Sequence, residues 1–243
     1  MNILKVKVGF ENCLENGKRL LDDGRFLQES LRVYSAIPLL VMSHEEFGKC
    51  NFLRHKIVTG EEVTDAEWKK LVAGGSHIKK LTMSSETAKK LLADVSDKEY
   101  RAATEWAHKN KLPWFGETKK ETIEMVTNSP NSLYNALKKK CLYVDIKNED
   151  WKNPATTYSA EKLYYACTIL YWSGYEVFLW HKLFWNNFEE GEKLDEDPEK
   201  IEKLLEKDPI MFELQDIRGI QQSEFWANAV NETKDILHEL DNS

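Results

Sequence analysis

Charged residues lie inside one of the most apolar segments of the chain. Residues 36–53 place apolar side chains on every side of a helix, and they enclose the motif Ser43-His44-Glu45-Glu46-Phe47-Gly48-Lys49. A helix that is apolar all round is buried in the protein. An isolated buried charge costs more free energy than folding usually offsets, so the charges of this helix need partners.

The spacing of these charges predicts one ion pair and leaves one carboxylate over. Glu45 and Lys49 stand at i and i+4 with the glutamate first, which is the favourable order on a helix. Glu46 lies about 100° further round and must meet another group. Two interpretations are open. Either the Glu45–Lys49 pair only sets the packing while Glu46 reaches solvent, or Glu46 belongs to a functional site.

Composition favours an all-α, soluble globular protein. Of the 243 residues, 42% are hydrophobic and 31% charged, with only 6 Pro and 11 Gly, and Leu, Lys, Glu and Ala dominate. Eight Trp residues predict a core rich in rings. The most apolar segment, 163–180, contains Glu176 and several polar residues, which favours a buried or interface helix over a membrane span.

The net charge of −7 is concentrated in one segment. Residues 189–208 hold ten acidic residues against four lysines, so the rest of the chain is almost neutral and this segment is predicted to be a linker. An RNA partner remains compatible with this charge, because a local basic patch is the relevant feature. The candidate lysines, which are alternatively solvated helix faces, are Lys69, Lys70, Lys79, Lys80, Lys89, Lys90, Lys138, Lys139 and Lys140.

The cysteines and the first residues indicate a reducing compartment. No CxxC pair occurs among the four cysteines, Cys13, Cys50, Cys141 and Cys167. Cys13 and Cys50 lie in apolar helical stretches, which is typical of buried thiols. Residues 1–10 lack the pattern of a secretion leader. We therefore expect a cytoplasmic protein.

Helical periodicity predicts a long antiparallel hairpin. Apolar residues recur at three- and four-residue steps over 11–31, and Gly17 and Gly24 in that stripe allow a partner helix to approach closely. A turn at 32–35 leads to a second helix that ends near residue 58, in which Pro38 is tolerable within the first turn.

Further elements follow from caps and patterns. Thr64 and Glu67 have the spacing of a capping box that opens a third helix through Leu71. We expect more helices at 79–93, 96–109, 119–126, 132–140, 160–188 and 221–240, and an extended stretch at 142–146. The expected organisation is a helical domain over 1–188, followed by an acidic linker and C-terminal helix over 189–243 that pack on the same domain.

Three blocks of the chain resemble the AbiV-type abortive infection family, a branch of the HEPN superfamily. The first is the hairpin with Arg32 and Tyr34 in its turn and Glu-Glu-x-Gly-Lys at 45–49. The second is Ser76-His77-Ile78-Lys79-Lys80-Leu81, which follows a helix bearing Trp68. The third is Tyr143-Val144-Asp145, with Trp151 and Pro154 downstream. The resemblance covers residues 11–154.

The resemblance implies an all-α, HEPN-like helical bundle, often dimeric, that defends bacteria against phage. Many HEPN relatives are metal-independent endoribonucleases with an Arg-x(4–6)-His motif. An imidazole can move the 2′-hydroxyl proton while a guanidinium binds the scissile phosphate. Arg101 and His108 have this spacing and would share a helix face. Alternatively they are an ordinary exposed pair, because Ala102 departs from the polar residue usual at that place.

We expect the working cluster to combine the embedded charges with the second block. Its members are Glu45, Glu46, Lys49, His77 and Lys80, with Arg101 and His108 as the nuclease pair. His44, Glu45 and His77 offer metal ligands, but no metal-binding spacing supports them, and no phosphate loop or dinucleotide motif occurs. We therefore expect no cofactor and no metal.

These features predict an abortive-infection effector that halts growth or translation by acting on RNA. The predicted partners are a second copy of the chain, RNA, and a phage-encoded activator or target protein. The alternative is a non-enzymatic helical protein that captures a phage or host protein.

Overall fold

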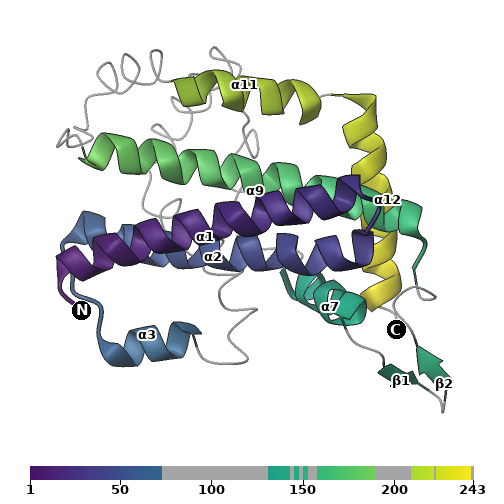
Figure 1. The fold of residues 1–243 in the computed structure, drawn as a ribbon, viewed down its shortest axis with the longest axis horizontal. Helices are drawn as coiled ribbons and strands as arrows, with labels where there is room; N and C mark the ends of the chain where they lie inside the picture. Colours follow the sequence, from purple (N-terminus) through teal and green to yellow (C-terminus); the bar gives the residue numbers. More distant parts are fainter. Residues whose placement is uncertain are drawn as a thin grey trace, which may run out of the picture.

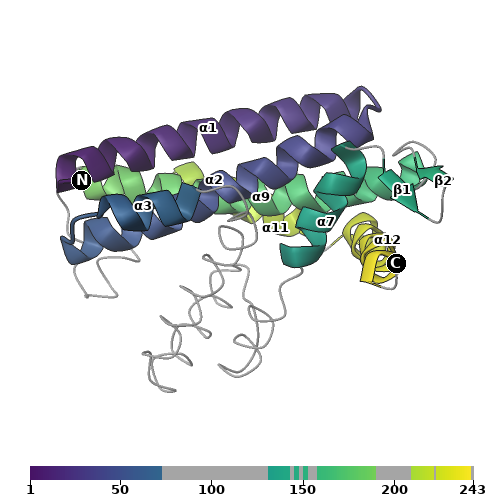
Figure 2. The ribbon, with the colours of Figure 1, turned by 90° about the horizontal axis from the view of Figure 1, so that it is seen from below.

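Three long helices form the centre of the protein. They are α1 (Ile3–Glu29), α2 (Val33–Thr59) and α9 (Ala160–Glu189), and Figures 1 and 2 show them lying alongside one another. The structure, a computed structural model, describes residues 1–72, 131–142, 145–147, 150–152, 158–189, 209–221 and 223–241. The predicted all-α fold is confirmed. The helices expected at 79–93, 96–109 and 119–126 lie outside the described residues.

The predicted hairpin of α1 and α2 is confirmed, and it is closely packed. A Cβ atom on Gly17 would lie 2.5 Å from the ring of Phe47, and one on Gly24 would lie 2.7 Å from Leu40. Only glycine permits this approach. The expected place of Pro38 was wrong: α2 already begins at Val33, so the proline lies in its second turn.

The ends of the hairpin are fixed by hydrogen bonds. Asn2 caps α1, because its side chain accepts a hydrogen bond from the Lys5 N–H at 3.1 Å. After the hairpin, the predicted capping box of α3 (Asp65–Val72) is confirmed. The Thr64 N–H donates to the Glu67 carboxylate at 2.8 Å, and the Glu67 N–H donates to the Thr64 hydroxyl at 3.1 Å. The bond from the Thr64 N–H, then those from Lys56 and from the Thr64 hydroxyl, lower the pKa of Glu67 to about 2.

The remaining elements surround one end and one side of the bundle. α7 (Asn131–Leu142) packs on α2, and the strands β1 (Asp145–Lys147) and β2 (Asp150–Lys152) pair in antiparallel fashion beyond it. α12 (Glu224–Asp241) runs steeply across the same end and contacts α9 and α7 (Figure 1). None of the described helices combines the length and apolar content needed to cross a lipid bilayer.

One helix was not expected. α11 (Pro209–Gln221) occupies part of the stretch between the acidic segment and the last helix, where no element was predicted. Proline suits the first position of a helix, where no N–H is needed. Ile210 and Ile217 are buried at i and i+7 and pack with Leu179 and Leu183 of α9, which explains why this segment is a helix.

The turn between α1 and α2 places Leu31 in the left-handed backbone conformation that glycine usually adopts. The Arg32 N–H donates to the Leu27 carbonyl at 2.8 Å and the Leu31 N–H to the Gln28 carbonyl at 2.9 Å, which is the Schellman pattern. Leu31, with φ of 58°, holds the left-handed position that glycine usually fills. Its side chain is 75% exposed, so packing does not offset the strain.

We expect Leu31→Gly to stabilise the protein by about 1 kcal/mol, because glycine adopts this conformation without strain. Chemical denaturation monitored by circular dichroism measures the change. Leu31→Ala is the matched control: it removes the exposed side chain but keeps the strain, so it should give no comparable gain. Equal gains from the two variants would assign the effect to the side chain instead.

Candidate functional site

A buried ion pair joins α2 to α7. The Lys138 ammonium lies 2.5 Å from Oε1 of Glu45, and both side chains are only 7% exposed. Each charge is thereby compensated in a place where neither could remain alone. This pair connects residues 93 positions apart in the chain.

The second acidic residue of the motif pairs within its own helix. Glu46 forms an ion pair with Lys49 at i and i+3, and their side chains are 16% and 15% exposed. The predicted Glu45–Lys49 pair was therefore wrong. Because Lys138 of α7 meets Glu45, Lys49 is left to compensate Glu46. The interpretation that Glu46 simply reaches solvent was also wrong, since most of its side chain is buried.

Glu46 and Lys49 also contact α1 through a thiol. The Cys13 thiol interacts with the charges of Glu46 and Lys49. Burial raises the pKa of the Cys13 thiol to about 11, Lys49 opposes this shift, and Glu46 adds to it. All four cysteines are free and buried, which confirms the predicted burial of Cys13 and Cys50. The Cys13 thiol is thus neutral at physiological pH and unsuited to act as a thiolate nucleophile.

The histidine beside the acidic pair faces a different helix. Nε2 of His44 lies 2.9 Å from the Leu170 carbonyl of α9, so this nitrogen carries the proton and donates it. Burial lowers the pKa of His44, and the bond to Leu170 partly opposes that shift. His44 therefore faces α9 while Glu45 faces α7, and the two do not converge on one ion. Within the described residues no group of His, Cys, Asp or Glu is arranged to hold a metal.

A second buried histidine was not foreseen. His181 of α9 is 2% exposed, and neither ring nitrogen makes a hydrogen bond. Burial is the main reason that the pKa of His181 falls to about 3, and the charge of Arg54 lowers it further. The Phe47 carbonyl opposes this shift, although it accepts no hydrogen bond from the ring. Arg54 stacks over the Phe184 ring at 5.6 Å. His181 is therefore neutral at physiological pH, and the sequence shows only that it lies in the aromatic helix.

A family model, HEPN_AbiV, described as AbiV, matches residues 5–169. The chain belongs to the AbiV family. The match runs from α1 into the first third of α9 and includes the Glu-Glu-x-Gly-Lys motif with its two ion pairs. No curated protein and no solved structure matches the chain. The family assignment indicates a role in abortive infection, a form of defence.

The structure divides the predicted AbiV site residues into two sets. Glu45, Glu46 and Lys49 lie on α2 and enter two separate ion pairs. His77, Lys80, Arg101 and His108 lie outside the described residues. Lys138 was expected in a candidate basic patch, and this was wrong because it is buried against Glu45. Buried Leu137 and Cys141 show that Lys138 shares their helix face, which is the sequence signal that could have revealed it.

We expect Glu45→Met to destabilise the protein by about 3–5 kcal/mol, because it leaves the Lys138 ammonium buried without its carboxylate. The double variant Glu45→Met/Lys138→Met replaces both charges by apolar groups of similar length and should recover most of that loss. Urea unfolding of the two variants and the parent protein measures the difference. A double variant as unstable as the single one would show that the charge of Lys138 is not the cause.

Proposed function

We propose that this AbiV-family protein is an abortive-infection effector that acts in the cytoplasm and halts growth of the infected cell by acting on RNA. The family match over residues 5–169 is the observation that carries this proposal. The family is defined by abortive infection, and its HEPN superfamily contains many ribonucleases. As in many HEPN relatives, a two-fold dimer is the proposed assembly.

The proposed chemistry is cleavage of RNA without a metal. Arg101 and His108, separated by six residues, have the HEPN nuclease spacing. An imidazole with an ordinary pKa of about 6.5 can move the 2′-hydroxyl proton near neutral pH. A guanidinium binds the scissile phosphate through paired N–H groups. His77 and Lys80, from the second family block, are proposed to complete the site.

The described charges support different roles for the two glutamates. Glu45 is sealed against Lys138, which fits a supporting role that fixes α7 on α2. Glu46 and Lys49 keep about one sixth of each side chain exposed, so their pair is accessible from outside the core. We therefore propose Glu46 and Lys49, rather than Glu45, as the working part of the motif.

The RNA proposal is tested with purified protein, total RNA and a chelator. We expect cleavage, and we expect His108→Ala and His77→Ala each to reduce its rate by about 100-fold or more with helicity unchanged. His55→Ala is the matched control, because His55 is exposed on α2 and belongs to no family block. Intact RNA with the parent protein, or cleavage that survives both substitutions, would reject the nuclease mechanism.

Glu46→Gln tests the motif in cells. It keeps the size of the side chain and removes the charge that Lys49 compensates, so we expect folding with a modest loss of stability and complete loss of phage protection. Glu62→Gln, an exposed position on the loop before α3, is the control and should protect like the parent. A plaque assay at equal protein abundance measures both. Full protection by Glu46→Gln would reduce the motif to a structural element.

A further inference from the structure

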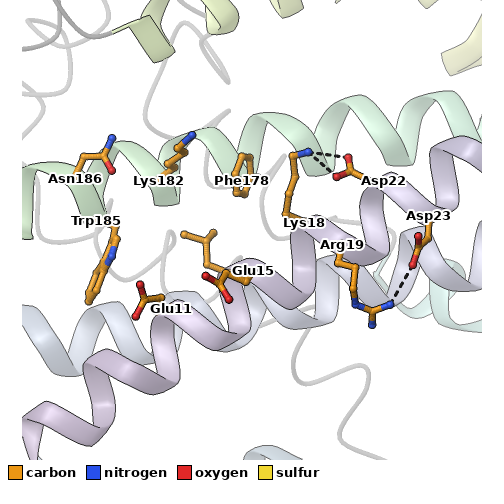
Figure 3. A pocket seen from close by; sticks show the side chains of 11 residues that line it. Glu11, Glu15, Lys18, Arg19, Asp22, Asp23, Phe178, Lys182, Trp185 and Asn186 are labelled. Atoms are coloured by element: carbon orange, nitrogen blue, oxygen red, sulfur yellow. Dashed lines mark hydrogen bonds and ion pairs between the residues drawn. The ribbon is translucent and has the colours of Figure 1, made fainter.

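A groove of about 610 Å³ runs between α1 and α9 on the surface of the bundle (Figure 3). Leu14 of α1 and the rings of Phe178 and Trp185 of α9 form its apolar floor. Leu14 is 6% exposed and the two rings are half-buried. Neither Glu46 nor Lys49 lines the groove, so the groove is separate from that ion pair.

Packing holds the aromatic floor in place. Trp185 stacks on Phe10 with ring centres 5.1 Å apart and planes inclined by 28°. The Lys18 ammonium lies 5.5 Å from the centre of the Phe178 ring. Side chains fixed in this way lose little entropy when a partner binds, which favours affinity.

The charges along α1 are compensated on one half of the groove and not on the other. Lys18 pairs with Asp22 at 2.7 Å and Arg19 with Asp23 at 3.1 Å. Glu11 and Glu15 line the other half, and neither forms an ion pair with a described residue. Lys182 of α9 also lines the groove, with its ammonium 5.9 Å from the centre of the Phe178 ring.

The two unpaired glutamates repel one another. Glu11 and Glu15 stand one helical turn apart, where like charges destabilise a helix. Figure 3 shows both on the α1 side of the groove, with Trp185, Lys182 and Phe178 on the α9 side. Both are exposed, so a bound cation can approach each of them. Acidic groups beside an apolar floor favour a partner that brings apolar and cationic groups together.

We infer that this groove binds a basic amphipathic helix of another protein. Two helices already form the walls, and a third helix lying between them would complete the packing of a bundle. Its apolar stripe would cover Leu14, Phe178 and Trp185, and lysines or arginines one turn apart would face Glu11 and Glu15. RNA is disfavoured here, because four carboxylates line the groove against the three cations Lys18, Arg19 and Lys182, so its net charge repels phosphates. The inference thus goes beyond the proposed action on RNA.

A synthetic helical peptide tests the inference. The probe is a fluorescein-labelled peptide of about four turns with leucines at i, i+3, i+4 and i+7 and a lysine pair at i and i+4 beside them. Fluorescence anisotropy with the full chain should show binding that weakens with added salt. The same peptide with glutamates for the lysines should not bind, and a single-stranded RNA oligonucleotide should not displace the probe.

Charge-neutral variants locate the site. We expect Glu11→Gln/Glu15→Gln to weaken binding of the lysine peptide about fivefold, as two exposed ion pairs are lost. Glu62→Gln/Glu224→Gln is the matched control, because it removes two exposed acidic groups elsewhere and changes the net charge equally. It should leave the affinity unchanged. All four positions are exposed, so each protein should fold as the parent does.

Several outcomes overturn the inference. Equal affinity for the lysine and glutamate peptides, or equal weakening by both double variants, would show that Glu11 and Glu15 do not select the partner. Displacement of the probe by RNA would assign the groove to nucleic acid. Light scattering that shows a dimer in the parent and the 28.4 kDa monomer in Glu11→Gln/Glu15→Gln would assign it to a second copy of the chain. RNA cleavage by the same double variant, measured separately, keeps failure here distinct from failure of the RNA proposal.

Discussion

Compensation of the charges inside α2 is the constraint on which the rest of the structure depends. Glu45 needs the lysine that α7 supplies, and Glu46 meets Lys49 of its own helix and the Cys13 thiol of α1. These contacts require α1 and α7 to lie in particular places against α2. Burial of an apolar helix would favour many packings, whereas an uncompensated charge in any of them costs several kcal/mol. The charges therefore select one arrangement among those that the apolar residues allow.

What the sequence predicted well depends on neighbours in the chain. The capping box at Thr64 and Glu67, the hairpin with its two glycines and the aromatic helix are all set by residues a few positions apart. The partner of Glu45 lies 93 positions away and is fixed only when α7 packs on α2, so helical spacing pointed to Lys49 instead. Leu31 was missed for a related reason: the turn lacks the glycine that usually marks a helix end.

The sequence located the charged motif of the candidate site but not the partners of its charges. Buried charges in an apolar helix located the motif, and the likeness of three blocks indicated the family that the comparison then showed. The exposed fractions of the side chains show which acidic residue is sealed and which is accessible. They are 7% in the Glu45–Lys138 pair and about 15% in the Glu46–Lys49 pair. The isolation of His181 could not have been predicted, because it arises where α1, α2 and α9 meet.

Charged side chains inside the bundle differ from Glu11 and Glu15, which line the groove, in whether they have partners. Inside the bundle the glutamates of the motif have cationic partners, and the described histidines of the core are held neutral by burial. Glu45 is sealed against Lys138, so any new contact to it must first break that pair, whereas the Glu46–Lys49 pair stays partly exposed and is the part of the motif that we propose to work. On the surface, Glu11 and Glu15 repel each other beside fixed aromatic rings, so a cationic partner relieves a cost that the free protein bears. The inferred partner site on the outer face of α1 and α9 is therefore distinct from the Glu45–Lys138 pair, which holds α7 on α2.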